Sequence, residues 1–457
     1  MPQRESTQHI VKPTLGVMAL MIYGVGNMLG AGIYGLVGKA AGELGNMVWL
    51  GFFASMIAAG LTGLSYASLG SRYPRAAGAA YITHRAFGIT AISYVVGLAV
   101  TMSGLTSLAA ASQVFANYAH AIFTGVPIKW VVVVFILTLT VINYVGMRES
   151  AWVNAICTAI EAGGLLLVIA VGARYWGSVD YFDASSIKNP GGDFSVSLML
   201  SGAVLTFYAF IGFEDLLNIS EEVRNPRRNF PLALLAALGI AATIYMAVCI
   251  TAVSVVPHAQ LAAASGPLVE VVRIAAPWVP PMLFTVVAMF AVTNTALLNH
   301  IMGSRLVYGM ARQGLLPALL GRLHPRRNTP HVAILLLLII VLGLALVGDI
   351  KALASATSLL LLGSFTLVNL ALVVLKRRPG EPRGGFEVPL AVPLGGAGVA
   401  VAFIVNRVID GVRSGELAPV YIAGGIVAAI AVLYLLLRPQ AAAVAEVEHP
   451  KQVGETE

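Results

Sequence analysis

The sequence predicts an all-α integral membrane protein with about twelve transmembrane helices. Hydrophobic residues make up 58% of the 457 residues and charged residues only 11%, whereas roughly 25% of the residues in an ordinary soluble domain are charged. The apolar residues gather in runs of about 20, the length of a helix that crosses a bilayer. Short charged segments separate these runs. Lipid is therefore the expected solvent for most of the surface.

Taken in order along the chain, twelve apolar runs are expected to form the transmembrane helices. They cover residues 14–38, 46–70, 89–121, 129–147, 151–174, 195–217, 231–256, 279–304, 330–348, 352–375, 390–407 and 418–437. The polar residues 1–13 precede the first run, which continues without a small-residue cleavage site, so no removable signal peptide is expected. The Ala- and Glu-rich tail at 438–457 lacks aromatic residues and is expected to be disordered.

The distribution of positive charge predicts the orientation in the membrane. Because twelve is an even number, both termini are expected on one side, and the loops on that side hold 20 of the 28 Lys and Arg residues. Such an excess marks the cytoplasmic side of a multi-pass protein. Both termini of this cell-membrane protein are therefore expected in the cytoplasm. The net charge of +7 follows from the same bias, and no nucleic acid partner is expected.

The first span, which contains GVGNMLGAGIYGLVG, is unusually rich in glycine. Each Gly costs a helix roughly 1 kcal/mol relative to Ala. One interpretation is close helix packing, because Gly26 and Gly30 have the spacing of a small-residue face. The other is a helix that breaks near Gly30-Ala31-Gly32, where free amides bind a carboxylate and free carbonyls bind an amine or a cation.

The sixth span, in SGAVLTFYAFIGFEDLLNISEEVRNPRRNFP, has Gly212 in mid-run and the acidic residues Glu214 and Asp215 just beyond it. Two Gly-interrupted spans five positions apart predict two five-helix halves of inverted topology. The halves would cover about 14–174 and 195–375 and form a core over 14–375. Residues 390–437 would add two further transmembrane helices.

Glu161 is the most informative single residue. It lies in the apolar fifth span with no opposite charge within a helical turn, and a charged residue in mid-membrane costs roughly 2.5–3.5 kcal/mol on insertion scales. Such a residue is expected to cycle a proton or to bind a cation. The alternative is a structural role, with a protonated Glu161 hydrogen-bonded across the bundle.

Several motifs follow one another over residues 20–330. In order, they are GVGNMLGAGIYG, YASLGSRYPRAAGAAYITHRAFG, AFIGFEDLLNISEEVRNPRRNFP, and GSRLVYGMARQGLLP with HPRRNTP. Together they resemble the motifs of the amino acid/polyamine/organocation (APC) transporter superfamily. The resemblance implies an amino acid permease with an inverted-repeat fold and broken first and sixth helices. It also implies secondary active transport by alternating access, with the substrate held between these two helices.

The resemblance also assigns candidate site residues. The substrate carboxylate would meet the backbone at Gly30, Ala31, Gly32 and Ile33. The substrate amine would meet carbonyls and an aromatic lid at Tyr208, Ala209, Phe210 and Ile211. Several proton-coupled relatives carry a Lys where Glu161 stands, near the sodium position of sodium-coupled relatives. Glu161, the carbonyls of Gly26 and Leu29, and the hydroxyls of Thr293 and Thr295 are therefore the expected coupling residues, although such hydroxyls often bond their own helix instead.

The expected function is proton-coupled uptake of an amino acid. Sodium symport and amino acid or polyamine exchange are alternatives in transport, and a non-transporting receptor or anchoring subunit is the alternative of another class. A neutral substrate is favoured because Glu161 and Glu214 are the only acidic residues expected near the site. No enzyme activity, cofactor or metal site is expected, because the sequence lacks a GxxxxGK[ST] motif and clustered metal ligands. The expected partners are a small amino acid or amine and the lipid bilayer, and the oligomeric state stays open.

Overall fold

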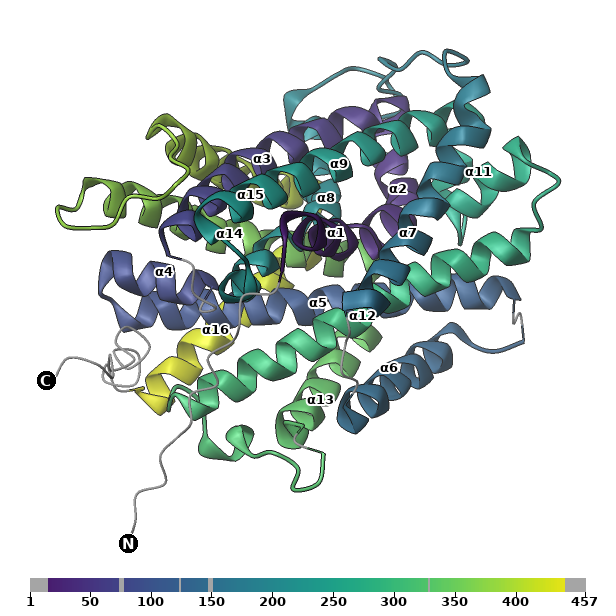
Figure 1. The fold of residues 1–457 in the computed structure, drawn as a ribbon. Coiled ribbons are helices and arrows are strands. Elements are labelled where there is room, and N and C mark those ends of the chain that lie inside the picture. The colour runs from purple at the N-terminus through teal and green to yellow at the C-terminus, as the bar shows by residue number, and fades with distance from the viewer. Residues whose placement is uncertain (1–14, 74–77, 123–124, 147–150, 328, 440–457) are drawn as a thin grey trace, which may run out of the picture.

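The computed structural model of the protein describes residues 15–73, 78–122, 125–146, 151–327 and 329–439 (Figure 1). The expected N-terminal segment 1–13 lies outside these residues, as does the expected tail from residue 440 onward. The described residues form a bundle of helices, and an isolated β-bridge pairs Leu15 with Val223.

The helices follow one another along the chain and are joined mostly by short loops. The α-helices are α1 (Val17–Met28), α2 (Ala31–Leu44), α3 (Val48–Arg72), α4 (Gly78–Phe87), α5 (Thr90–Ile122), α6 (Ile128–Val145), α7 (Ala151–Gly172), α8 (Val196–Phe207), α9 (Pro226–Val255), α10 (His258–Ala263), α11 (Pro267–Ala275), α12 (Pro281–Arg312), α13 (His331–Val347), α14 (Ile350–Arg377), α15 (Ala391–Ser414) and α16 (Ala418–Leu437). Short 3-10 segments are η1 (Gly45–Met47), η2 (Ala173–Tyr175), η3 (Tyr208–Phe210), η4 (Phe213–Glu222) and η5 (Ala318–Gly321).

Each of the twelve predicted spans has a helical counterpart. Among the described residues, 10 helical segments are long and apolar enough to cross a membrane, and α1 and α13 are shorter apolar helices. The prediction of an all-α membrane protein with about twelve transmembrane helices is confirmed. Three short helices, α4, α10 and α11, lie between the spans; apolar run length could not predict them, because they are too short to cross a bilayer.

The first and sixth spans are both broken, as predicted. The first consists of α1 and α2, which are separated at Leu29 and Gly30. The sixth runs from α8 into η3, breaks at Ile211 and Gly212, and continues as η4. Gly212 has a φ of 119°, a conformation that glycine adopts readily and other residues rarely do. The predicted glycine thus occupies the position where the backbone turns.

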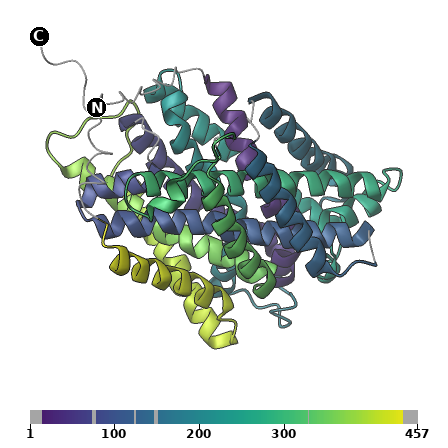
Figure 2. The ribbon, with the colours of Figure 1, turned by 90° about the horizontal axis from the view of Figure 1, so that it is seen from below.

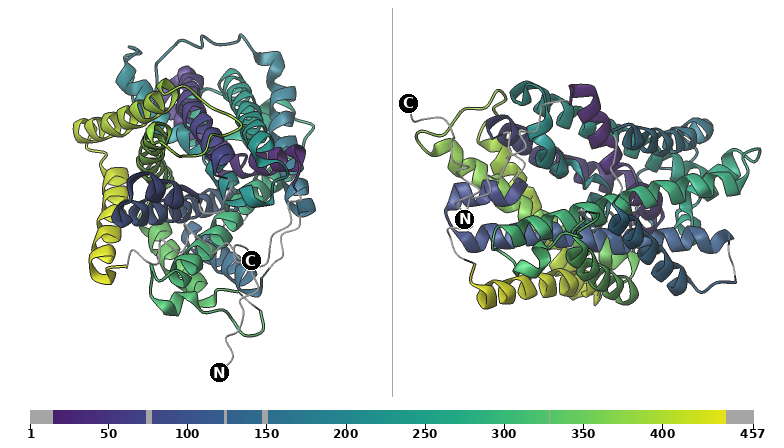
Figure 3. Two further views of the ribbon diagram at one scale, coloured as in Figure 1. Left: turned by 60° about the vertical axis from the view of Figure 1, so that its left-hand side comes forward. Right: turned by 60° about the horizontal axis from the view of Figure 1, so that its bottom comes forward.

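The broken helices lie inside the bundle. Figure 1 shows α1 near the centre, with α5 and α12 running beside each other below it. Figures 2 and 3 show α16, at the yellow end of the colour scale, along one edge of the bundle. Only Pro419, Ala423 and Ile430 of α16 are buried, so most of this helix is left for lipid to cover. The central elements therefore have the sheltered position expected of a site between the two broken helices.

The segment between α14 and α15 folds back onto α3 and α4. The Glu387 carboxylate accepts hydrogen bonds from Arg72 Nη2 at 2.6 Å and from Lys376 Nζ at 2.7 Å, while Glu381 pairs with Arg85 at 2.8 Å. Burial by itself would raise the pKa of Glu387, but the hydrogen bonds from Arg72 and Lys376 lower that pKa to about 2. These contacts tie the last two helices to the end of α3.

Candidate functional site

The two helix breaks are in direct contact with each other. A Cβ atom added to Gly212 would lie 2.7 Å from the carbonyl oxygen of Asn27 in α1. A Cβ added to Gly32 in α2 would lie 2.4 Å from Cα of Ala209 in η3. Real Cβ atoms do not approach backbone atoms this closely, so glycine is required where these backbones meet. The structure therefore brings together the two segments that the resemblance assigned to the substrate.

The break in the first span frees backbone amides at the start of α2. The first N–H groups of a helix have no partner within the helix, and in α2 these belong to Ala31 and the residues that follow it. The N–H of Ala31 donates to Thr295 Oγ1 of α12 at 3.4 Å. The helix dipole adds positive potential at this end. The start of α2 is thus suited to a carboxylate.

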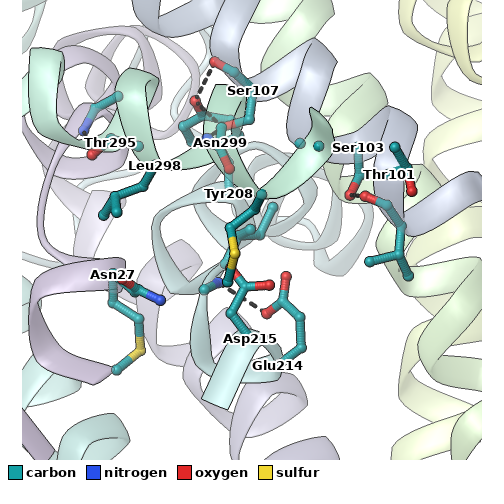
Figure 4. Close-up of a pocket in the computed structure, with 18 of the residues that line it drawn as sticks. Asn27, Thr101, Ser103, Ser107, Tyr208, Glu214, Asp215, Thr295, Leu298 and Asn299 are labelled. Atoms are coloured by element: carbon teal, nitrogen blue, oxygen red, sulfur yellow. Dashed lines mark hydrogen bonds between the residues drawn. The ribbon is translucent and has the colours of Figure 1, made fainter. Parts of the chain in front are cut away.

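A polar cavity lies between the breaks and the helices α5 and α12 (Figure 4). Ser107 of α5 forms its upper wall in this view, with Ser107 Oγ 2.9 Å from Tyr208 Oη and 3.0 Å from Asn299 Nδ2. Glu214 and Asp215 lie on the opposite side. The cavity therefore offers hydroxyl and amide groups on one side and carboxylates on the other.

The candidate substrate residues divide into two sets around this cavity. Ala31, Gly32, Tyr208 and Ile211 line it. The other four candidates are Gly30, Ile33, Ala209 and Phe210, which are buried and are not part of the lining. These four shape the backbone behind the cavity wall.

Glu161 lies outside the cavity, in the middle of α7. Its side chain is fully buried, and its Oε1 accepts a hydrogen bond from Asn294 Nδ2 of α12 at 2.8 Å. Its Oε2 has no hydrogen-bond partner among the described residues. The Tyr34 hydroxyl of α2 donates to the backbone carbonyl of Glu161 at 2.7 Å. Glu161 thus connects α7 with α2 and α12 and keeps one oxygen unoccupied.

The remaining coupling candidates do not all gather around Glu161. A Cβ on Gly26 would lie 2.1 Å from Thr158 Oγ1, one helical turn before Glu161, and Leu29 is fully buried at the break. Thr295 contacts the start of α2, but Thr293 Oγ1 donates to its own helix at Met289 O and its side chain lines an apolar groove beside α6. Thr293 is therefore directed away from the other candidates.

Three successive residues of α12 thus contact three different environments. Thr293 faces the groove beside α6, Asn294 binds the Glu161 carboxyl group, and Thr295 binds the first amide of α2. Side chains on neighbouring helical residues point in different directions because a helix has 3.6 residues per turn. A single turn of α12 therefore contacts both the buried acid and the edge of the polar cavity.

Sequence reasoning missed Tyr245, Ser107 and Asn299. The Tyr245 hydroxyl of α9 lies 2.6 Å from Met28 O and 2.8 Å from Ala209 O, carbonyls that the two breaks release. All three residues lie in long, mainly apolar helices that carry several scattered polar side chains. No signal in the sequence shows which way such a side chain points.

Comparison with known proteins shows which family a chain with these broken helices belongs to. The sequence matches the family described as amino acid permease over residues 15–437. The chain belongs to the amino acid permease family. The permease is accordingly a membrane transporter for amino acids or related compounds and is not an enzyme. Its match covers both broken spans and all the candidate residues.

Relatives align with the permease over most of their own length. An uncharacterized transporter of Mycobacterium tuberculosis is 31% identical, with coverage of 87% of this chain and 88% of the relative. The methylthioribose transporter of Bacillus subtilis is 26% identical over 86% of this chain and 88% of its own. The branched-chain amino acid permease BcaP of the same organism is 26% identical over 89% of both chains.

Proposed function

We propose that the permease takes up an amino acid across the cell membrane by secondary active transport, with alternating access around the cavity between the two helix breaks. The contact between these breaks is the observation that carries the proposal. The first amides of α2 would receive the substrate carboxylate, and carbonyls freed at the breaks would receive its amine. The match to a branched-chain amino acid permease supports an amino acid as the substrate.

Proton coupling at Glu161 is the proposed driving mechanism. Oε1 of Glu161 accepts the hydrogen bond from Asn294, while Oε2 is free to take a proton. A neutral carboxyl group is a weaker acceptor than a carboxylate, so protonation changes the bond to Asn294. The adjacent Thr295 binds the start of α2. A change in α12 would therefore reach the amides that are proposed to hold the substrate.

The test is uptake of radiolabelled amino acids and polyamines into proteoliposomes under an imposed pH gradient or sodium gradient. Wild type and Glu161→Gln are compared, with Thr293→Val as the control because Thr293 is directed away from the acid. Glu161→Gln is expected to lose accumulation driven by the pH gradient and to retain substrate counterflow. The control is expected to keep both.

Other outcomes would select or remove specific parts of the proposal. Accumulation that follows the sodium gradient would indicate sodium symport, and flux that needs substrate on both sides would indicate exchange. Unchanged accumulation in Glu161→Gln would make the residue structural. If no compound in the panel moves under either gradient, the transport proposal itself fails, and a receptor or anchoring role becomes the better account.

The cytoplasmic position of both termini is part of the same proposal. It can be tested with reporters fused to the C-terminus in a bacterial host. A green fluorescent protein fusion is expected to fluoresce, and an alkaline phosphatase fusion is expected to be inactive. The reverse pair of results would invert the proposed orientation.

A further inference from the structure

The described wall of the polar cavity contains two acidic residues and no basic ones. Glu214 and Asp215 line it, and the described residues that form its wall include no Lys, Arg or His. Figure 4 shows the two carboxyl groups beside each other at one side of the open space. A site of this composition attracts cations and repels a second anion.

Hydrogen bonds within the protein satisfy these carboxylates only in part. Glu214 is 8% exposed, and its Oε2 accepts the Gly212 N–H at 2.9 Å. Asp215 has a long contact of 3.4 Å from Asn218 Nδ2. Neither acid forms an ion pair with any described residue. Burial makes a carboxyl group costly to ionise, and an adjacent cation favours the ionised form. A cationic ligand would therefore be held by charge-assisted contacts at these two groups.

The two sides of the break in the first span have opposite character. Ala31 and Gly32 place the positive end of α2 on the wall, which suits a carboxylate. The C-terminal end of α1, at Asn27 and Met28, also lines the cavity. The negative end of this helix suits the α-amine, although the Met28 carbonyl already accepts a hydrogen bond from the Tyr245 hydroxyl. A neutral amino acid would use these two positions and leave Glu214 and Asp215 without a counter-charge.

Apolar side chains also line the cavity. Met28, Leu298 and Met302 contribute to the wall. The side chains of Lys and Arg lay their methylene stems along apolar surfaces while the charged head reaches a polar environment. The cavity wall therefore offers groups suited to both parts of such a side chain.

We infer that the cavity selects amino acids with a cationic side chain and holds the side-chain ammonium or guanidinium group at Glu214 and Asp215. This inference rests on the proposed transport function. It differs from the sequence-based expectation of a neutral substrate for two reasons. The structure adds Asp215 to the cavity wall, and it places Glu161 outside the cavity, where that acid cannot meet the substrate.

The first test compares ligands on the wild-type protein. Lysine, ornithine and arginine are set against alanine and leucine in competition with uptake and in thermal stabilisation of the purified protein. The cationic amino acids are expected to compete and to stabilise at concentrations lower than those of alanine or leucine by about tenfold or more. Putrescine, which lacks a carboxylate, is expected to be weaker than ornithine because it cannot use the amides of α2.

The second test removes one negative charge. Asp215→Asn is expected to raise the KM for lysine by about 10- to 100-fold, because a charged hydrogen-bond partner is lost. Glu222→Gln is the matched control, since it removes the same charge from the same segment η4 but lies outside the cavity lining. The control is expected to keep the KM for lysine within about twofold.

The results separate this inference from the proposed function. If alanine or leucine is transported and the cationic amino acids neither compete nor stabilise, the charge selectivity is refuted and the transport function stands. Equal effects of Asp215→Asn and Glu222→Gln on lysine would also refute it. If no amino acid is transported or bound, both conclusions fall. The ligand comparison on wild type decides the question even if Asp215→Asn does not fold.

Discussion

Replacing Gly212 by Ala is expected to damage both the stability and the transport activity of the permease. The φ of 119° at this position is unfavourable for any residue with a Cβ atom, at a cost of about 1–3 kcal/mol. The new Cβ would also lie 2.7 Å from the oxygen and 2.9 Å from the carbon of the Asn27 carbonyl. Overpacking of this kind costs about 1–3 kcal/mol. The expected loss of stability is therefore about 2–6 kcal/mol.

The assay is thermal unfolding of the purified protein in detergent, followed by uptake into proteoliposomes. Gly239→Ala is the matched control, because nothing lies within 4 Å of a Cβ at Gly239 in α9, and a helical Gly→Ala change is favourable by about 0.5–1 kcal/mol. Gly212→Ala is expected to unfold at a lower temperature and to lose uptake, whereas the control keeps both. A Gly212→Ala protein as stable and active as the control would refute the tight contact between the helix breaks.

Two further changes probe α12 and the segment beyond α14. Thr295→Val removes the hydroxyl that binds the first amide of α2 and is expected to lower kcat/KM for uptake by about 2- to 10-fold. The control Thr293→Val is expected to leave uptake unchanged. An equal loss in both variants would contradict the different directions of these side chains. The depressed pKa of Glu387 contributes stability that is fully present above about pH 4.5 and is lost as the pH falls toward 2. The free energy of unfolding of Glu387→Gln, measured as a function of pH, is therefore expected to lack this loss of stability in acid. A pH dependence equal to that of wild type would show that the hydrogen bonds from Arg72 and Lys376 contribute no such stability.

The sequence predicted the spans and the two helix breaks because these features are local. A run of about 20 apolar residues has few alternatives to a membrane helix, and Gly212 interrupts such a run at the turn. Helix ends were harder to place. α12 continues to Arg312, past the predicted end at 304, because residues with good helix propensity follow the apolar run.

The site was less predictable because it depends on the rotation of each helix about its axis. Thr293 and Thr295 are the same residue type in the same helix, yet Thr293 faces a groove and Thr295 faces the start of α2. An apolar helix lacks the polar face that would indicate its orientation. Tyr245 shows the same difficulty, because its hydroxyl binds the carbonyls of Met28 and Ala209, which are far from it in the sequence and close only in the folded protein. Likewise, only the structure shows that Glu161 lies outside the cavity.

The segment that joins α14 to α15 also bears on where the permease can be shortened. Sequence alone divides the chain into a ten-helix core and two appended helices. This division suggests that the chain could be shortened after residue 377. The structure argues against a cut at that point, because Glu387 covers Arg72, whose side chain is only 5% exposed at the end of α3. A truncated chain would leave this guanidinium without its counter-charge at the end of a helix that packs against α9. The smallest unit expected to fold intact therefore includes the linker between α14 and α15 as well as the core.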